Sequence, residues 1–391
     1  MNFKKTIVAL SLLGLGSLAY AADETLDVGV IATISGAGAG WGQAIQHGVE
    51  LAAKEVNEAG GLEVDGKKYK INVITYDDKY QAGEAVTAVN RLVHQDKVKF
   101  IIGPVGSAAA VAIKPVTEKN EVIMSTMAFS EKILNENSPF TFRANVTTVE
   151  FAQPQIDWIV KKYGIKKIGS FFPNDETGLQ VSKDVEKAYG NAGVELVGKE
   201  FYERDRVDFV PMLTRLMGLD VDAIELNINA PSSAGLIVKQ ARDLGFEGLF
   251  IRTGGPSTQE IVNVAGEDAS EGILVHTLID PDLATTQAYM QKHKENYTQA
   301  MNGFSPSFYD TARMIFEAIK QANTVDDTKA VVAKLENIKD FDGAAGKISW
   351  TGQDTYGINH QISTPFYVAE VVDGQEVIRA RCTVETGCQD G

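Results

Sequence analysis

Short runs of β-branched and aromatic residues alternate with amphipathic stretches along most of the chain. The runs predict strands at residues 27–35, 69–77, 98–104, 121–125, 167–172, 223–228, 249–253 and 272–276. The amphipathic stretches predict helices at 44–58, 82–94, 149–162, 181–190, 209–217, 231–244, 307–322 and 328–336. Strands that alternate with helices are typical of an α/β fold with parallel, doubly wound sheets. Because such sheets bind ligands beyond the carboxyl ends of their strands, functional residues are expected where strands stop.

The C-terminal part returns to strands after two helices, which bears on how the chain is divided. Residues 365–372 and 376–380 read as strands around the hairpin signal Asp373-Gly374. No low-complexity linker separates two halves of the chain. We therefore predict two lobes that share the chain through several crossings. The first comprises residues 27–145 with 281–350, and the second 147–277 with 351–391.

The first 21 residues, MNFKKTIVALSLLGLGSLAYA, have the pattern of a secretory signal. Two lysines precede an apolar run at residues 7–18, and Ala-Tyr-Ala at 19–21 is a suitable cleavage site. The run is too short to span a bilayer, and no cysteine stands at the cleavage site to carry a lipid. The mature protein is expected free in the periplasm, without membrane insertion.

Net charge narrows the classes of binding partner, and length indicates the number of domains. Removal of the signal leaves 35 basic and 52 acidic residues, a net charge of −17. An acidic surface without a basic cluster argues against nucleic acid and anionic membranes as partners. About 370 remaining residues exceed what one core supports, which favours two domains.

The two cysteines, Cys382 and Cys388, lie six positions apart near the C-terminus. In an oxidising compartment this pair is expected to form a small disulfide that holds the tail locally. A redox-active C-x-x-C or a metal-ligand set does not fit the spacing.

The stretch ISGAGAGWGQ, residues 34–43, places glycines between a predicted strand and a predicted helix. It does not fit the dinucleotide fingerprint G-x-G-x-x-G, because the third glycine falls on Trp41 or on Gln43. A large aromatic residue beside a small-residue turn suits a small organic ligand. The alternative is a flexible turn with a packed Trp, and the loop alone leaves both open.

No enzyme signature emerges from the remaining motifs. The sequence contains no G-x-S-x-G elbow, and the five histidines form no metal-binding pattern. Asp77 and Asp78 are adjacent on a strand, so they point to opposite faces. No catalytic residue, metal or cofactor is therefore assigned, and a binding protein is favoured over an enzyme of unrecognised type.

Several motifs resemble those of the branched-chain amino-acid-binding proteins, the type I periplasmic solute receptors of ABC importers. These motifs are Ser35-Gly36 before a helix, the helix end Glu58-Ala59-Gly60-Gly61, Asp77-Asp78 after a strand, Gly103 to Ser107, and VNVAGEDASEGILV. The resemblance covers nearly all of the mature chain. It implies two α/β lobes joined by three crossover hinges, a small molecule enclosed in the cleft, a monomer, and a membrane permease as partner. Trp41 matches the position of an aromatic wall against the ligand.

A carboxylate site is expected around Gly106 and Ser107, where a buried strand gives way to an alanine-rich helix. N–H groups at a helix N-terminus and one hydroxyl hold a carboxylate well, although Ser is also an ordinary N-cap residue. The resemblance favours ligand contact. Thr126, in the following segment MSTMAFSEK, is included among the candidate residues.

The chain departs from the resembling family at three ligand positions. Ala128 replaces a threonine, Thr177 replaces an aromatic residue, and Gly254 replaces the acid that neutralises the ligand's ammonium. A buried ammonium without a counter-charge costs several kcal/mol. These three departures favour an aromatic or aliphatic carboxylic acid as the ligand over leucine, isoleucine or valine. A hydrophobic amino acid is the second choice.

Polar residues at strand ends are candidates for a distal group of the ligand. Arg252, Asn227 and Asn229 suit a second carboxylate, a carbonyl or a phenol. The alternative for Arg252 is a surface or interlobe salt bridge, and Arg143 is expected to serve the hinge. An acid from elsewhere, such as Asp175, Glu225 or Asp310, would restore amino-acid binding. A binding domain that signals through a receptor also remains open.

Overall fold

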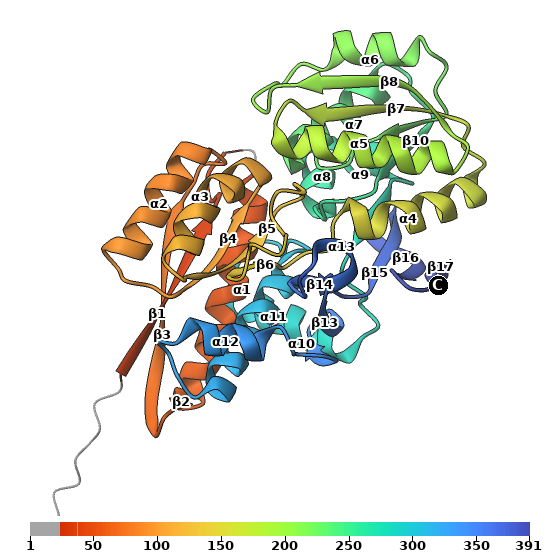
Figure 1. Ribbon diagram of the computed structural model, residues 1–391. Helices are drawn as coiled ribbons and strands as arrows, with labels where there is room; N and C mark the ends of the chain where they lie inside the picture. Colours follow the sequence, from red (N-terminus) through yellow and green to blue (C-terminus); the bar gives the residue numbers. More distant parts are fainter. Residues whose placement is uncertain (1–23, 37) are drawn as a thin grey trace, which may run out of the picture.

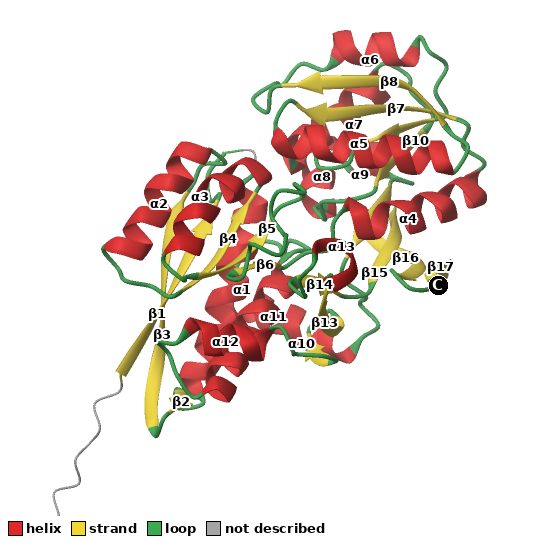
Figure 2. Ribbon diagram, in the orientation of Figure 1, coloured by secondary structure: helices red, strands yellow, loops and turns green. Residues whose placement is uncertain are grey.

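The computed structural model describes residues 24–36 and 38–391, which form two α/β lobes side by side (Figure 1). The predicted signal sequence lies outside the described residues. Each lobe has a central sheet with helices on both faces (Figure 2). The predicted fold class, two doubly wound lobes with mainly parallel sheets, is confirmed.

The first lobe contains a nine-stranded sheet in the order β12-β13-β14-β6-β5-β4-β1-β3-β2. Its strands are β1 (Glu24–Ala32), β2 (Leu62–Val64), β3 (Lys67–Asp77), β4 (Phe100–Val105), β5 (Ile123–Met127), β6 (Thr141–Arg143), β12 (Phe341–Gly343), β13 (Gly346–Thr351) and β14 (Gln361–Ser363). Its helices are α1 (Ala39–Glu58), α2 (Ala82–His94), α3 (Ser107–Lys119), α10 (Ala284–Asn296), α11 (Ser305–Ala322), α12 (Thr328–Leu335) and α13 (Gln353–Tyr356). The pairs from β3 across to β14 are parallel, whereas β2, β12 and β13 pair antiparallel at the edges.

Alternate residues of the first sheet enter different cores, as the two-residue period of a strand requires. Ile101 and Ile31 pack with α2 and α3 on one face. Ile102 and Val30 pack with α1 and α11 on the other. Burial on both faces explains why these strands read as continuous apolar runs.

The second lobe contains an eight-stranded sheet in the order β17-β16-β15-β11-β10-β9-β7-β8. Its strands are β7 (Lys167–Pro173), β8 (Glu195–Tyr202), β9 (Ala223–Glu225), β10 (Leu249–Arg252), β11 (Leu274–Thr277), β15 (Phe366–Val372), β16 (Gln375–Thr383) and β17 (Gly387–Asp390). Its helices are α4 (Thr148–Tyr163), α5 (Glu176–Asn191), α6 (Val210–Met217), α7 (Pro231–Asp243), α8 (Thr258–Ala265) and α9 (Glu267–Ser270). Strands β7 to β11 are parallel, and β15 to β17 add an antiparallel extension.

The chain passes between the sheets three times, after β6, after β11 and after β14. One expectation about this division was wrong. Residues 361–363 were assigned to the second lobe, but β14 pairs with β6 and β13 in the first sheet. The last crossing therefore lies at residues 364–365, because β14 finds its backbone partners beside Arg143 rather than in the second sheet.

The predicted elements are present with shifted ends. Helix α4 begins at a capping box, in which the side chain of Thr147 accepts from the Val149 N–H and Glu150 accepts the Thr147 N–H at 2.7 Å. The same helix ends at Gly164 in the left-handed region. Pattern alone missed β8, which is an edge strand with mostly half-buried residues, and α10, in which few side chains are buried.

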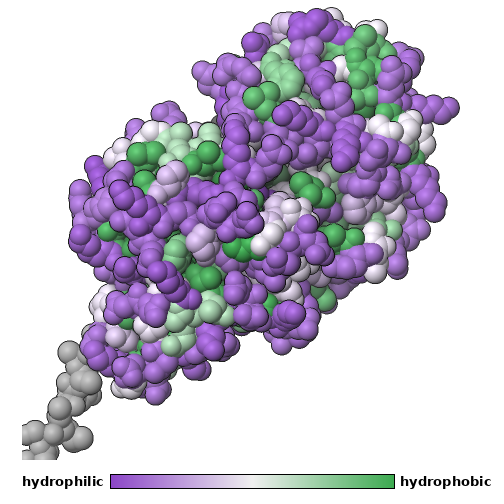
Figure 3. Space-filling view, in the orientation of Figure 1, coloured by the Kyte–Doolittle hydropathy of each residue, from purple (hydrophilic) through white to green (hydrophobic). Residues whose placement is uncertain are grey.

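The predicted disulfide is present between Cys382 and Cys388, which face each other across β16 and β17. No helix in the described ranges is both long and apolar enough to cross a membrane. The face seen in Figure 3 is mainly hydrophilic, with small scattered apolar patches.

Candidate functional site

A pocket of about 440 Å³ opens between the two lobes. The first lobe lines it with loops that follow β1 and β3, and the second lobe with the loop after β8 and the residue before α7. The lining residues are Ser35, Gly36, Gly38, Trp41, Lys79, Tyr80, Gln81, Glu203, Arg204, Asp205 and Ala230. These loops follow the carboxyl ends of their strands, where the α/β pattern predicts a ligand site.

Two aspartates hold the first-lobe loops in place. Asp77 accepts from the Ser35 hydroxyl at 2.6 Å, and Asp78 accepts from the Thr33 hydroxyl at 2.6 Å and from the Tyr80 N–H at 2.9 Å. The loop after β3 is therefore tied to the glycine-rich loop after β1.

Trp41 lies in the first turn of α1 and is almost fully buried. Its ring centroid is 6.2 Å from that of Tyr80, and a methyl group at Gly255 would lie 3.8 Å from the indole. The indole Nε1 is buried and has no hydrogen-bond partner within the described residues. Trp41 thus forms a flat wall that touches both lobes and keeps one donor free.

Ser107 and Thr177 are buried and meet across the lobes, with the Ser107 N–H donating to the Thr177 Oγ1 at 2.9 Å. The Ser107 hydroxyl accepts from the N–H groups of Phe129 and Ser130, each at 3.0 Å. In this closed arrangement the predicted carboxylate donor at Ser107 is paired with the opposite lobe.

Gly106 adopts a φ of 99° beside the Tyr80 ring. A methyl group at Gly106 would lie 2.8 Å from the Tyr80 Cζ, so a side chain here would displace the ring. Glycine is therefore required both by the backbone and by the close approach of Tyr80.

Thr126 and Ala128 make their contacts within the first lobe. The Thr126 hydroxyl donates to the Pro104 carbonyl at 2.8 Å. Ala128 packs in a small apolar cluster with Ala110, Ile133 and Leu134. Both residues support the loop that carries Ser107's partners, and neither lines the pocket.

Arg252, Asn227 and Asn229 converge at the ends of β9 and β10 beneath the cleft. The buried Arg252 guanidinium donates to the carbonyls of Gly255, Leu226 and Asn229 at 2.7, 2.9 and 2.8 Å. Burial lowers its pKa to about 10. It forms no ion pair in the described part of the chain, so the salt bridge offered as the alternative does not occur here.

The two asparagines differ in whether their side-chain oxygen has a hydrogen-bond partner. Asn229 donates to the Phe171 carbonyl at 3.0 Å and accepts from the Tyr202 hydroxyl. Asn227 donates to the Thr253 hydroxyl at 2.8 Å, while its Oδ1 is buried without a partner in the described ranges.

Gly254 is enclosed by Asn227, a candidate from the sequence, and by Phe151, which the sequence pattern did not indicate. A methyl group there would lie 2.8 Å from the Asn227 Oδ1 and 2.8 Å from the Phe151 ring. Phe151 itself packs between His276 and Phe129. The position therefore has no room for an acidic side chain unless its surroundings move.

The three acids considered as substitutes have other contacts. Asp175 caps α5 through the Gly178 N–H and pairs with Arg204. Buried Glu225 accepts from the Tyr189 hydroxyl at 2.7 Å and from the N–H groups of Asn227 and Thr253. Burial raises the pKa of Glu225 to about 7.

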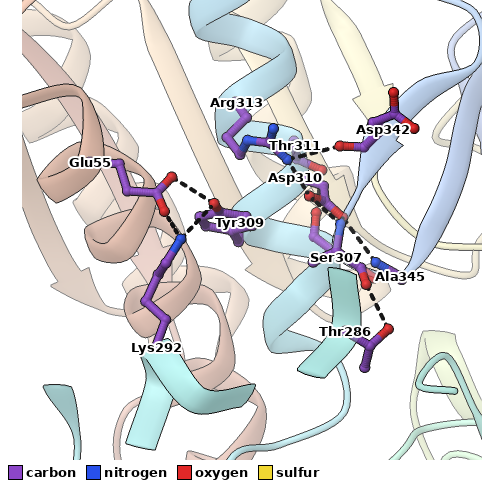
Figure 4. A network of polar contacts seen from close by, with 11 residues as sticks. Glu55, Thr286, Lys292, Ser307, Tyr309, Asp310, Thr311, Arg313, Asp342 and Ala345 are labelled. Atoms are coloured by element: carbon purple, nitrogen blue, oxygen red, sulfur yellow. Dashed lines mark hydrogen bonds and ion pairs between the residues drawn. The ribbon is translucent and has the colours of Figure 1, made fainter. Parts of the chain in front are cut away.

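Asp310 belongs to a polar network inside the first lobe, away from the pocket (Figure 4). Its carboxylate accepts from the Ala344 and Ala345 N–H groups and pairs with Arg313. Nearby, Glu55 contacts both Lys292 and the Tyr309 hydroxyl. Burial raises the pKa of Asp310 to about 6. This acid fastens α11 to the β12–β13 hairpin.

Sequence reasoning missed Tyr80 and Arg204, although both follow the end of a strand. Tyr80 comes three residues after β3, and Arg204 comes two residues after β8. The rule that ligand residues lie where strands stop could have found Tyr80 directly. Arg204 was hidden because β8 was not among the predicted strands. Within the described residues, no group of three or more His, Cys, Asp or Glu side chains could hold a metal ion.

Comparison with known proteins places this arrangement in a family. Residues 25–376 match the periplasmic binding protein family. A Leu/Ile/Val-binding protein homologue of Brucella melitensis is 24% identical over 370 residues, covering 94% of this chain and 96% of that protein.

Two solved structures show the same fold. The branched-chain amino-acid transporter substrate-binding protein LivJ of Streptococcus pneumoniae, in complex with isoleucine, has a TM-score of 0.80 and 24% identity, covering 94% of this chain and all of that one. A solute-binding protein of an ABC transporter from R. palustris, in complex with benzoate, has a TM-score of 0.81 and 20% identity, covering 94% and 98%. The protein has two interleaved lobes with a pocket between them at the strand ends, and the family match covers nearly the whole described chain. It therefore belongs to the periplasmic binding protein family, as its resemblance to the Leu/Ile/Val-binding proteins predicted.

Proposed function

We propose that this protein is a periplasmic receptor that encloses a small carboxylic acid between its lobes and delivers it to the permease of an ABC importer. The observation that carries the proposal is the interlobe pocket, which both lobes line with strand-end loops. A ligand that contacts both lobes stabilises the closed state by its differential affinity, and hinge closure follows. The permease would then recognise the closed form.

The pocket's chemistry supports an apolar or aromatic body on the ligand. Trp41 and Tyr80 supply flat walls, and the loop after β3 holds Tyr80 in position. The space at Gly254 is closed by Phe151 and Asn227, which supports the absence of an acid for an α-ammonium. Of the two similar solved structures, one contains isoleucine, an amino acid, and the other benzoate, an aromatic acid, so the fold accommodates both ligand classes under consideration.

A branched-chain amino-acid receptor with a rearranged ammonium site is the second candidate. Asn227 Oδ1 favours it, because this buried acceptor has no partner within the described residues. An amide oxygen can accept from an ammonium, although it supplies no counter-charge.

Thermal-shift screening of the mature protein tests the proposal. The panel contains benzoate, 4-hydroxybenzoate, short aliphatic acids and the proteinogenic amino acids. A ligand at a hundredfold excess over its Kd adds about 2.7 kcal/mol of stability, so a true ligand gives a clear rise in melting temperature. We expect the largest rise with an aromatic or aliphatic acid. A rise with leucine or valine and with no deaminated acid would favour the second candidate instead.

A further inference from the structure

The loop after β8 carries Arg204, whose guanidinium is only partly hydrogen-bonded within the described residues. Arg204 lines the interlobe pocket, and only 18% of its side chain is exposed. Its Nε pairs with Asp175, the N-cap residue of α5. The terminal nitrogens Nη1 and Nη2 are buried and have no hydrogen-bond partner among the residues that the structure describes. Four N–H donors are therefore unpaired, two of them on the Nη1–Nη2 edge.

The position of the guanidinium is fixed by its surroundings. Its central carbon lies 4.3 Å above the Tyr80 ring, so first-lobe Tyr80 and second-lobe Arg204 stack across the cleft. The ion pair with Asp175 holds the other edge, and Asp175 is anchored by the Gly178 N–H at 2.9 Å. Because ring and carboxylate hold two sides of the group, the free edge has a defined direction.

The two acid-binding donors that the sequence suggested, Arg252 and Ser107, are already engaged. Arg252 donates to three backbone carbonyls. The Ser107 N–H is bound to Thr177, and the Ser107 hydroxyl accepts two backbone N–H groups. Buried guanidinium N–H groups without partners are rare and costly, and a carboxylate satisfies two of them at once.

We propose that Arg204 is the main contact of the ligand's carboxylate, which binds the Nη1 and Nη2 edge in a bidentate manner while the ligand's body lies against Tyr80 and Trp41. The inference rests on the proposed function. It moves the anion site from the N-terminus of α3 to the second lobe, where Arg204 lies against Tyr80 of the first lobe.

The charges around Arg204 limit the ligand to a monocarboxylate. Asp175 already offsets one positive charge, and the exposed Glu203 and Asp205 flank the arginine in the pocket lining. Lys79 faces them from the first lobe, where it also pairs with Glu84. A dianion such as a phosphate ester would meet these carboxylates, whereas a single carboxylate needs only the free edge of the guanidinium.

The test measures binding of one acid and its amide to the wild type and four variants by calorimetry. The acid is the strongest carboxylate binder among benzoate, 4-hydroxybenzoate, isoleucine and the aliphatic acids. The proteins are the wild type, Arg204→Gln, Arg204→Lys and Ser107→Ala. Arg206→Gln is the matched control, because Arg206 lies in the same loop, is exposed, and among the described residues its side chain donates only to the Asp208 carbonyl. Phenyl phosphate serves as the dianionic probe.

We expect Arg204→Gln to weaken binding of the acid by about 10- to 100-fold, the range for a lost hydrogen bond to a charged group. Arg204→Lys should recover part of the loss, Arg206→Gln should bind as the wild type does, and the amide should bind weakly to every protein. Arg204→Gln also loses the ion pair with Asp175 and the stack on Tyr80, so its ligand-free melting temperature should fall. The preference of the wild type for the acid over the amide should shrink in Arg204→Gln and return in part in Arg204→Lys, whereas a purely structural arginine would leave that preference unchanged.

Three results would overturn the inference. The first is a wild-type affinity in Arg204→Gln together with a large loss in Ser107→Ala, which would leave the proposed function intact. The second is equal affinity of the wild type for acid and amide, or stronger binding of phenyl phosphate. The third is the absence of any carboxylate among the binders, which would remove the proposed ligand class as well.

Discussion

At the residue scale, the second lobe keeps an acid where burial opposes its charge. Glu225 is fully buried at the end of β9, and its carboxyl accepts the Tyr189 hydroxyl and two backbone N–H groups. Burial is the larger effect and raises the pKa from 4.5 to about 7. The folded protein therefore retains this proton where the unfolded chain has lost it.

Glu225→Gln should stabilise the protein at neutral and higher pH. Between about pH 4.5 and 7 the unfolded state binds fewer protons than the folded state, so the stability of the wild type falls as pH rises. Gln keeps the shape without the charge, and its advantage should grow to roughly 3 kcal/mol by pH 8, at 1.36 kcal/mol per pKa unit. Melting temperatures of both proteins from pH 4 to 8 measure this. The exposed Glu63→Gln is the control, and a difference that does not change with pH would contradict the prediction.

At the element scale, the C-terminal hairpin is closed by a bond that lies far from the pocket lining. Cys382 and Cys388 join β16 to β17, and Asp390 at the end of β17 accepts from the Trp158 indole at 3.0 Å. The tail is thereby held against α4 of the second lobe. The two cysteines are only six positions apart in the sequence, so the entropic contribution of the disulfide is modest.

Replacing both cysteines with serine should lower the melting temperature slightly and leave ligand affinity unchanged. The bond constrains the tail in the unfolded chain and makes no contact with the pocket. Calorimetric unfolding and titration with the ligand found by screening measure the two properties. A large loss of affinity would show that the tail contributes to the cleft.

At the scale of the whole molecule, the two lobes touch through several polar contacts besides the pocket. The Asn302 amide, before α11, donates to Glu260 on α8 at 2.7 Å and to the Pro256 carbonyl at 3.2 Å. Glu176 on α5 pairs with Lys132 at 2.9 Å. Such contacts bias the equilibrium between open and closed states, and the ligand adds to that bias.

Asn302→Asp should open the ligand-free protein. The new carboxylate would face Glu260 while still accepting the Phe304 N–H, so repulsion acts across the lobes with little local change. We expect a larger radius of gyration in X-ray scattering, and an affinity about tenfold weaker because fewer molecules are closed, equivalent to roughly 1.4 kcal/mol. Asn296→Asp is the control, because Asn296 is exposed and donates only within α10. Unchanged scattering and affinity would rule out this contact as part of the closure.

The sequence by itself determined the alternation of strands and helices, the two lobes, the disulfide and the family. These properties follow from local periodicity and from short motifs, so residues near one another in the chain are enough to reveal them. Loops after β1, β3 and β8 line the interlobe pocket, at strand ends of the kind where the pattern predicts ligand residues.

Only the tertiary structure decided which polar groups are engaged and which are free. Ser107 hydrogen-bonds to Thr177, which lies 70 positions later in the sequence. The Arg252 guanidinium donates to three backbone carbonyls, including that of Leu226. Gln361, at the start of β14, pairs with Arg143 of β6, more than 200 positions earlier, and this pairing places β14 between β13 and β6 in the first sheet. Tyr80 and Asp175 contact the Arg204 guanidinium, and its two terminal nitrogens have no hydrogen-bond partner among the described residues. Each of these depends on contacts between distant segments, which a local pattern cannot encode.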